Sequence, residues 1–325
     1  VMDRMQDYFI HMNTNGGGAF ITSQQSDALM DEGHAALADL VGSSDPGEII
    51  FGQNMTTLTL HLSRSIGRTL SAGDEIVVTR MDHDANVSPW LLMAEDHGLK
   101  VRWMDFNPET FRYDQDALDR VLTPKTKLVA VNYASNATGT VNDIRSISRK
   151  AHEVGALVFV DAVQFTPHFV TDVKAIECDF LACSAYKFYG PHQGLIWGKR
   201  DLLEAYTPYK VRPATNSLPG AYETGTQSHE GMAGTLGAVE HFEWVGSEMG
   251  AGGSSRRERI ISGFNVIAEY ERELGRRLIR GLKHIPGVTI YGLTEDVDLV
   301  DRVPTVAITK EGVHPRHMAE SLGDA

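Results

Sequence analysis

Cysteine and long apolar runs are both scarce in this chain. Its 325 residues include two cysteines, Cys178 and Cys183, and their spacing matches neither a zinc motif nor a disulfide framework. We therefore expect no metal site, and we expect both cysteines to be small buried side chains in a protein of a reducing compartment, the cytoplasm. No run approaches the ~20 apolar residues that a membrane helix needs, so no membrane partner is expected.

Basic residues are outnumbered as well. The chain has 30 Lys and Arg residues against 43 Asp and Glu residues, which gives a formal net charge of −13 at pH 7. Binding to a phosphate backbone needs clustered Lys and Arg, so nucleic acid is not expected as a partner. The hydrophobic content of 42% and the charged content of 22% are typical of a soluble globular protein.

Neither end of the chain has the sequence of an ordinary domain terminus. Val1 begins inside a helix-like pattern and Ala325 follows soon after a strand-like one, so we expect segments beyond both ends. A length of 325 residues suits one large domain plus a smaller one. We expect a large cofactor-binding domain over residues 1–250 and a smaller, incomplete α+β domain over residues 251–325, with a glycine-rich junction at residues 250–253.

Strand-like and helical patterns alternate along the chain. Short apolar runs predict strands, and longer runs with a period of 3.6 residues predict helices. The alternation predicts a mainly parallel α/β sheet with helices on both faces. Predicted strands lie at residues 48–52, 75–79, 99–104, 127–132, 157–160, 179–183 and 195–198, and predicted helices include residues 23–41, 114–122, 144–155 and 254–282.

Two of these strands end in polar residues that could form one site. Asp161 and Gln164 follow one buried run. Ser184 and Lys187 follow the next. The carboxyl ends of parallel strands meet at one edge of the sheet, so these side chains are expected to lie close together. Taken singly, each has a plain alternative, such as a solvated lysine or a helix-capping aspartate, but four residues in register favour a shared site.

A lysine and a carboxylate at one sheet edge suit a particular chemistry. Lysine can hold an aldehyde cofactor as a Schiff base. A carboxylate can keep a pyridine nitrogen protonated, so that the ring accepts electrons. A nicotinamide oxidoreductase would share the sheet, but no Gly-x-Gly-x-x-Gly lies between a predicted strand and helix.

The two segments resemble the cofactor core of the class V aminotransferase family, fold type I pyridoxal-phosphate enzymes, in its cysteine desulfurase and selenocysteine lyase branch. The family's Asp-x-x-Gln is matched by Asp161 and Gln164, and its Ser-x-His-Lys-x-x-Gly-Pro is matched by residues 184–191, with Tyr186 in place of histidine. The resemblance implies pyridoxal 5'-phosphate as the cofactor. It implies that Lys187 carries the aldehyde and then acts as the base, and that Asp161 holds the pyridine nitrogen protonated.

The remaining roles at this core also follow from the resemblance. Gln164 would donate to the cofactor O3′, and Ser184 would hold the phosphate. Tyr186 could donate its phenol to the phosphate in place of the family's histidine.

A predicted strand, a glycine turn and a helix start follow one another at residues 48–57. The free N–H groups of a helix start form an anion site, and the resembling family holds the cofactor phosphate at this turn. The phosphate is therefore assigned to Met55, Thr56 and Thr57. The alternative is plain N-capping by Asn54 or Thr56.

Two further loops match the family. The segment at residues 81–86 resembles Glu-His-x-Ala-Asn, in which the histidine stacks on the pyridine ring, so His83 inherits that role. The segment at residues 135–140 matches Ser-Asn-x-x-Gly-Thr, and its Asn136 would lie near O3′ and the substrate carboxylate. The alternatives are that His83 is an ordinary loop histidine, and that Asn136 and Gly139 are ordinary turn-forming residues.

Residues 222–227 resemble the family's Phe-Glu-x-Gly-Thr. The resemblance implies a homodimer in which Thr226 of each subunit reaches the phosphate of the other. The implied function is cysteine desulfurase-like cleavage of C–S or C–Se bonds in an amino acid. Because neither Cys178 nor Cys183 lies where the family has its nucleophilic cysteine, a class V aminotransferase or a C–S β-lyase without a persulfide stays open. A non-catalytic cofactor-binding protein is less favoured, since the lysine and the aspartate are both present.

Overall fold

The structure is a computed structural model that describes residues 1–114 and 116–324. Among these residues, a seven-stranded sheet has the order β1-β7-β6-β5-β4-β2-β3. Neighbouring strands from β6 to β3 run parallel, whereas β7 is antiparallel to both β6 and β1. The predicted mainly parallel α/β fold is confirmed. The strands are β1 (Ile49–Gly52), β2 (Glu75–Thr79), β3 (Lys100–Met104), β4 (Thr126–Asn132), β5 (Leu157–Asp161), β6 (Phe180–Ser184) and β7 (Gly194–Gly198).

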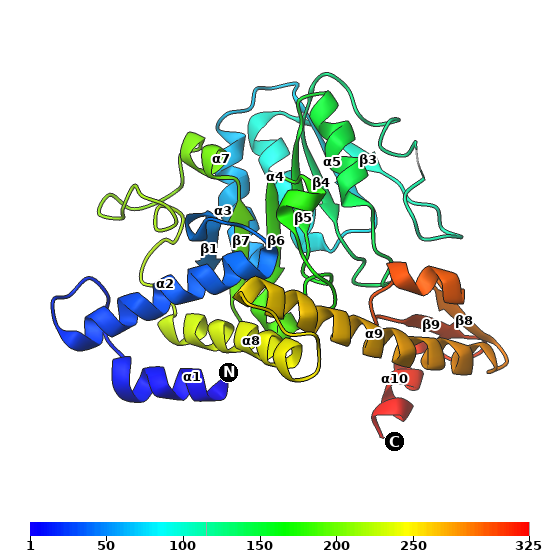
Figure 1. Cartoon of the computed structure of the whole chain (residues 1–325). Helices are drawn as coiled ribbons and strands as arrows, with labels where there is room; N and C mark the ends of the chain where they lie inside the picture. The colour runs from blue at the N-terminus through cyan, green and yellow to red at the C-terminus, as the bar shows by residue number, and fades with distance from the viewer. Residues whose placement is uncertain (115, 325) are drawn as a thin grey trace.

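Helices cover both faces of this sheet (Figure 1). The helices of the larger body are α1 (Met2–Asp7), α2 (Ile21–Val41), α3 (Met55–Gly67), α4 (Ser88–His97), α5 (Ile144–Glu153), α6 (Val173–Ile176), α7 (Arg200–Ala205) and α8 (His229–Glu248). Two buried apolar clusters result. One joins a sheet face to α2, α5 and α8, and the other joins the opposite face to α3 and α4.

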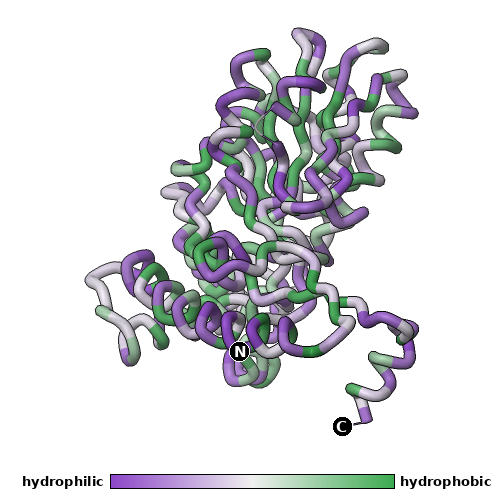
Figure 2. Tube along the Cα trace, turned by 90° about the vertical axis from the view of Figure 1, so that its right-hand side faces the viewer, coloured by the Kyte–Doolittle hydropathy of each residue, from purple (hydrophilic) through white to green (hydrophobic). Residues whose placement is uncertain are grey.

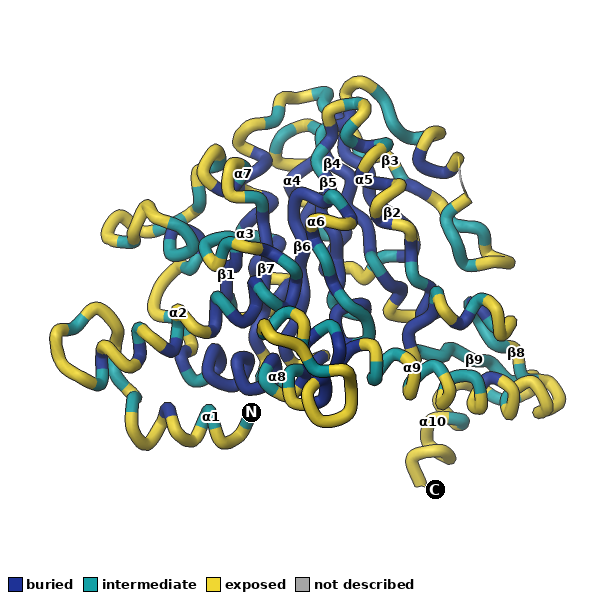
Figure 3. Tube along the Cα trace, in the orientation of Figure 1, coloured by how far each residue is buried: buried dark blue, intermediate teal, exposed yellow. Residues whose placement is uncertain are grey.

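The middle residues of the central strands are apolar because both faces of these strands are covered. Along β5, Val158 and Val160 point into one cluster and Phe159 points into the other. All three side chains are fully buried. Figure 3 shows the strands buried along most of their length, with exposed residues on the outer loops and helices.

Apolar residues gather along the strands in the interior of the larger body, and hydrophilic residues lie outside (Figure 2). No helix within the described residues combines the length and the apolar character that crossing a membrane requires.

The helix predicted over residues 114–122 is wrong for the described part of that segment, which forms turns. Ala117 N–H donates to the Asp114 carbonyl over 2.9 Å, as in a single turn. The segment buries Ala117 and Leu118, which anchor one turn, and Pro124 prevents its continuation as a helix.

Beyond the sheet, the chain continues into α9 (Arg256–Lys283), the 3-10 helix η5 (Asp296–Asp301) and α10 (Pro315–Gly323). Strands β8 (Val288–Tyr291) and β9 (Ala307–Lys310) form a separate antiparallel sheet. The first half of α9 packs against α8, where Phe264 stacks on Phe242 at 4.4 Å between ring centroids. The division near residue 250 stays a prediction, because this helix belongs to the packing of both parts (Figure 1).

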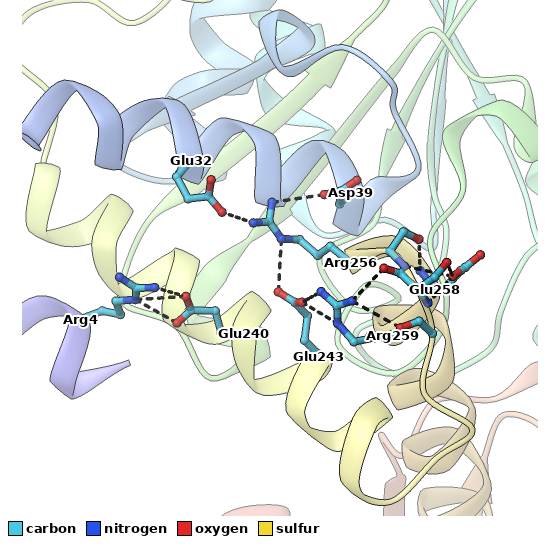
Figure 4. Close-up of polar contacts among 11 residues, drawn as sticks. Arg4, Glu32, Asp39, Glu240, Glu243, Arg256, Glu258 and Arg259 are labelled. Atoms are coloured by element: carbon cyan, nitrogen blue, oxygen red, sulfur yellow. Dashed lines mark hydrogen bonds and ion pairs between the residues drawn. The ribbon is translucent and has the colours of Figure 1, made fainter.

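Ion pairs tie α1, α2, α8 and α9 together on one side of the molecule (Figure 4). Arg256 lies between Asp39 of α2 and Glu243 of α8, at 3.3 Å from each. Arg4 of α1 pairs with Glu240 of α8. These contacts fix α8, whose loop on the N-terminal side carries Thr226.

Candidate active site

The carboxyl ends of β4, β5 and β6 meet above a cavity of about 300 Å³. Asn132 of β4 lies beside Asp161 of β5 in the sheet register. Nine of the predicted site residues line this cavity, and Thr57 and Thr226 do not. The nine are Met55, Thr56, His83, Asn136, Asp161, Gln164, Ser184, Tyr186 and Lys187.

Lys187 reaches the cavity from a tight turn after β6. The turn is a 3-10 helix that ends at Tyr189, whose φ of 70° is left-handed. Gly190 N–H then donates to the Ala185 carbonyl over 2.8 Å, and a Cβ at Gly190 would lie 2.9 Å from that oxygen. Over residues 1–114 and 116–324, no hydrogen bond occupies the Lys187 amine, which lies 5.2 Å from the centre of the Tyr186 ring.

Asp161 is buried at the end of β5, with 6% of its surface exposed. Its Oδ1 accepts a hydrogen bond from Val163 N–H over 2.9 Å. Burial raises the pKa of this carboxyl to about 6, against the opposing effects of that hydrogen bond and of His83 and Lys187. A carboxylate held in this way is ready to pair with a cationic nitrogen inside the cavity.

His83 follows β2 and caps a short 3-10 helix, with its Nδ1 accepting from Ala85 N–H over 3.1 Å. The preceding Asp82 carries a second carboxyl group, which accepts several hydrogen bonds. Asp82 Oδ1 accepts from Asn86 over 2.6 Å, and Oδ2 accepts from Asn132 N–H over 3.1 Å. Burial, together with the charge of Asp161, raises the pKa of Asp82 to about 8 despite these donors. This network fixes the segment that presents His83 to the cavity.

Asn136 lies in a loop that is braced from within and from outside. Thr138 N–H donates to Ser135 Oγ over 3.1 Å, and Gly139 adopts the left-handed φ of 76° that closes the turn. Val303 N–H, from the segment after η5, donates to the Gly139 carbonyl over 2.9 Å. The second part of the chain therefore helps to position Asn136.

The first turn of α3 forms one wall of the cavity. Asn54 is its N-cap, and its side chain accepts from Thr57 N–H over 2.9 Å. The capping role offered as an alternative is therefore present, and it occupies the Thr57 N–H. Met55 and Thr56 line the cavity together with Asn54, so an anion in the cavity would lie against the helix start.

Gly194 of β7 lets α3 begin at this place. A Cβ on Gly194 would lie 2.1 Å from the Asn54 carbonyl carbon and 2.5 Å from Met55 N. Both are backbone atoms, so a side chain here would displace the first turn of the helix.

Thr57 and Thr226 face a second hollow of about 740 Å³, on the other side of the first turn of α3. His61 and Arg64 also line it. The Thr226 loop is anchored by Glu223, whose Oε1 accepts from His34 Nε2 and from Phe51 N–H, each over 2.8 Å. The structure thus does not bring Thr226 into the cavity of its own chain.

Sequence reasoning missed two polar residues of the cavity, Asn54 and Asn132. Asn132 ends β4, so the rule that singled out Asp161 could have found it. The two cysteines lie elsewhere. Cys178 and Cys183 are unpaired, at most 2% exposed, and do not line the cavity. Burial raises the pKa of both thiols well above the ordinary value, which keeps them protonated and unreactive.

Comparison of the sequence with known proteins identifies a family and several relatives. The sequence profile of the family "Aminotransferase class-V" matches residues 1–325. The Aminotransferase-like protein FGM3 of Gibberella zeae is 33% identical over 322 residues, which cover 97% of this chain and 75% of that protein. A probable cysteine desulfurase of Streptomyces coelicolor is 28% identical over 342 residues, covering 100% of this chain and 77% of that protein.

Solved structures of two cysteine desulfurases are similar to this chain over nearly its whole length. The apo structure of a cysteine desulfurase from Thermococcus onnurineus superposes with a TM-score of 0.88 at 25% identity, covering 99% of this chain and 78% of that one. The cysteine desulfurase CsdA of Escherichia coli superposes with a TM-score of 0.82 at 25% identity, with the same coverage of each chain.

Proposed function

The chain belongs to the class V aminotransferase family, and we propose that it is a pyridoxal-phosphate enzyme that acts on an amino acid in the manner of a cysteine desulfurase. The substrate would be of the cysteine or selenocysteine type, with cleavage of its C–S or C–Se bond. One observation carries the proposal: an amine with no hydrogen bond to the described residues and a buried carboxylate, Lys187 and Asp161, line the same cavity.

The residues around the cavity fit this cofactor. Ser184 is 4% exposed, and its hydroxyl has no hydrogen-bond partner within the described residues. It would hold the phosphate together with Thr56 and the N–H groups at the start of α3, of which Met55 is the first residue. Tyr186 would donate its phenol to the same phosphate. Thr57 would support the helix start from its outer side, where its N–H and its hydroxyl both donate to Asn54.

The ring of the cofactor would occupy the space between Asp161 and His83. Asp161 would hold a proton on the pyridine nitrogen, and His83 would stack on the ring face. Gln164 and Asn136 would donate to the ring oxygen O3′, and Asn136 would also face the substrate carboxylate. When bound, the cofactor supplies an electron sink for bond breaking at the substrate α-carbon.

Lys187 has two tasks in this proposal. Its Nζ would hold the cofactor through the aldehyde group, and it would be the general base for the substrate α-proton. The turn from Ala185 to Gly190 keeps the amine at the rim of the cavity for both tasks.

The reaction type has a second candidate. Cys178 and Cys183 are buried away from the cavity, so neither can take a sulfur atom from the substrate. Unless another thiol of the protein reaches the substrate, this favours a C–S β-lyase or an aminotransferase reaction. Their burial without pairing also supports the proposal that the protein works in the reducing cytoplasm.

The test uses the lysine. Reduction of the holoenzyme with borohydride should fix the cofactor on the peptide that contains Lys187, and Lys187→Ala should abolish both this labelling and turnover while leaving the fold intact. Lys187→Arg is the matched control, because it keeps the positive charge but cannot bond to an aldehyde. Labelling of another lysine, or turnover by either variant at the wild-type rate, contradicts the assignment.

A further inference from the structure

His34 forms a buried pair with Glu223 outside the cofactor cavity. It lies on α2 and is 8% exposed. Its Nε2 lies 2.8 Å from Glu223 Oε1, and its Nδ1 lies 2.7 Å from the Met30 carbonyl oxygen, one helical turn earlier. The ring of Phe51 packs edge-on against the imidazole, at 4.9 Å between ring centroids. Both nitrogens of His34 therefore face oxygen atoms in a place that is nearly closed to solvent.

These two partners decide the protonation state of the ring. A carbonyl oxygen and a carboxylate oxygen accept hydrogen bonds and cannot donate them. A neutral imidazole has one N–H, so its other nitrogen would turn a lone pair toward an oxygen, whereas an imidazolium donates to both partners. A proton on Glu223 instead would also avoid this conflict, but a glutamic acid ionises about two pH units below an imidazolium. The geometry therefore indicates an imidazolium paired with a carboxylate.

The charges close to His34 favour the same state. Burial by itself lowers the pKa of this imidazole, but the hydrogen bond to Glu223 and the charge of Glu223 act against burial, together with the Met30 carbonyl. Asp31, on α2 itself, adds a smaller effect in the same direction. The net result is that the pKa of His34 is raised above its ordinary value.

The titratable groups of the helices packed against α2 have partners of their own. His229 of α8 is hydrogen-bonded to Tyr8 over 3.0 Å. Arg256 of α9 is paired with Glu32 and Asp39 (Figure 4). The positive charge of His34 is therefore answered by the carboxylate that its Nε2 contacts.

Glu223 begins the exposed segment that carries Thr226. Its Oε1 accepts from Phe51 N–H as well as from His34, so one carboxylate joins this segment to β1 and to α2. Residues 224–226 are exposed, and Thr226 lies three residues after the carboxylate. A change in the hold on Glu223 therefore reaches the Thr226 hydroxyl through a short stretch of exposed backbone.

We propose that His34 is a positioning residue for the cofactor phosphate, because its imidazolium holds Glu223 and Glu223 holds the segment that presents Thr226. This inference rests on the proposed function, with Thr226 as a ligand of the phosphate. Loss of the proton from His34 removes the charge-assisted hydrogen bond to Glu223 and loosens the Thr226 segment. Because the folded protein raises the pKa of His34, this support is complete below the ordinary histidine pKa and is lost as the pH rises through the raised pKa.

The first experiment follows the pair in the cofactor-free protein, so it does not depend on the proposed function. An NMR titration should show one imidazole that titrates above the ordinary histidine pKa and is missing from the spectrum of His34→Gln. The protection factor of the Phe51 amide in hydrogen exchange, which reports its bond to Glu223, should fall at least about threefold from pH 6 to pH 9.

Two variants separate the charge of His34 from its size. His34→Arg keeps a positive charge at both pH values, so the protection of the Phe51 amide should stay high at pH 6 and at pH 9. His34→Gln keeps a donor for Glu223 without a charge, so the protection should be low at both pH values. Either variant is sufficient where the other does not fold.

The second experiment connects the pair with the site. From pH 6 to pH 9, the Kd for the cofactor should rise roughly three- to tenfold more in the wild type than in His34→Arg, because a loosened segment still carries the Thr226 hydroxyl. The comparison cancels the pH dependence of the cofactor and of Lys187, which both proteins share. In a Thr226→Ala background, His34→Gln should have no further effect on the Kd, since the segment then has no phosphate ligand to position.

His152→Gln is the matched control. His152 of α5 also forms a histidine–carboxylate pair, with its Nε2 at 2.8 Å from Asp179 Oδ2, but that pair has no link to the Thr226 segment. This variant should keep the pH dependence of the wild-type Kd and the wild-type protection of the Phe51 amide.

Three results overturn the proposal, and they differ from one another. A neutral His34 at pH 6, or equal protection of the Phe51 amide at both pH values in the wild type, shows that the charged pair does not exist. A pair that titrates as described, in a protein that binds cofactor at Lys187 with a Kd independent of His34, shows that the pair does not act on the phosphate. If the proposed function itself fails, borohydride does not label Lys187 although the pair titrates, and the role toward the phosphate ends with it.

Discussion

At the scale of single residues, Asp161 combines a functional position with a cost to stability. Its folded pKa is about 6, against 3.8 for a free aspartate. Well below pH 4, the Asp161 carboxyl is protonated in both the folded and the unfolded protein. Between pH 4 and pH 6, the folded protein binds this proton more tightly than the unfolded protein does. Above pH 6 the carboxylate is ionised in both states, so the stability that protonation supported has been lost. The folded protein without cofactor should therefore become less stable as the pH rises through this window.

Asp161→Asn tests this linkage. The amide oxygen can still accept from Val163 N–H, but the buried charge is gone. We expect the cofactor-free variant to be more stable than the wild type at pH 7.5, by up to about 3 kcal/mol in the free energy of unfolding. The advantage should shrink toward pH 4.5, and urea unfolding at the two pH values measures it.

The same variant, although more stable, should lose catalytic activity. An amide cannot hold a proton on the pyridine nitrogen as a carboxylate does, so turnover should fall by orders of magnitude. A variant that is both unchanged in stability at pH 7.5 and fully active would contradict the role of Asp161.

At the scale of elements, the contact between β7 and the start of α3 decides where the anion-binding helix terminus lies. Gly194 permits this contact, because a Cβ there would fall within 2.1 Å of the Asn54 backbone. Backbone atoms cannot yield as the end of a flexible side chain can. The glycine therefore has a role in the site although its own atoms do not line the cavity.

Gly194→Ala should displace the first turn of α3 and weaken cofactor binding. Loss of one hydrogen bond to a charged phosphate, worth about 1.5–3 kcal/mol, corresponds to a roughly ten- to hundredfold rise in the Kd for the cofactor. A fluorescence titration of the apoenzyme measures the Kd. Gly281→Ala is the control, since Gly281 lies in α9 where an added Cβ would meet no atom within 4 Å, and it should leave the Kd unchanged. Equal affinities in the two variants would show that the β7 contact does not position the helix start.

At the scale of the whole molecule, Thr226 lies in the hollow beside its own cofactor cavity and not inside it. The first turn of α3 separates the two, with Thr56 on one side and Thr57 on the other. We propose a homodimer in which Thr226 of one subunit reaches the phosphate of the other, related by a two-fold axis.

Mixed dimers distinguish this arrangement from a site built within one chain. Thr226→Ala alone should raise the Kd for the cofactor roughly ten- to hundredfold, and Lys187→Ala alone should be inactive. In a dimer of one subunit of each kind, the Thr226→Ala subunit supplies Lys187 and receives Thr226 from its partner. One site per mixed dimer should therefore bind cofactor with wild-type affinity and turn over.

Sedimentation provides the control. The protein should sediment as a dimer at micromolar concentration. At a cofactor concentration near the wild-type Kd, the separately purified variants should gain activity only after subunit exchange. A monomer with normal cofactor affinity, or mixed dimers whose active sites all bind weakly, would place the Thr226 contact elsewhere.

The sequence by itself determined the parts that depend on local pattern. Runs buried on both faces must be apolar, so the strands of the sheet could be found, and polar residues directly after them marked the cavity edge. Asp161, Ser184 and Lys187 were predictable for this reason, and the family motifs added His83 and Asn136. Helix α8 was missed, because α1, α2 and α9 surround it. Residues 231–239 of this helix are all buried and show no polar stripe, and glycines of the helix at close contacts, such as Gly246 against α9, weaken the helical pattern further.

Only the tertiary structure decided which neighbours share a surface. Thr56 and Thr57 are adjacent in sequence, but successive residues of a helix point about 100° apart, so they enter different hollows once the start of α3 is placed. The pKa of Asp161 depends on how deeply the fold buries its carboxyl group. Distances between groups remote in sequence set these properties, and the order of residues along the chain does not contain those distances.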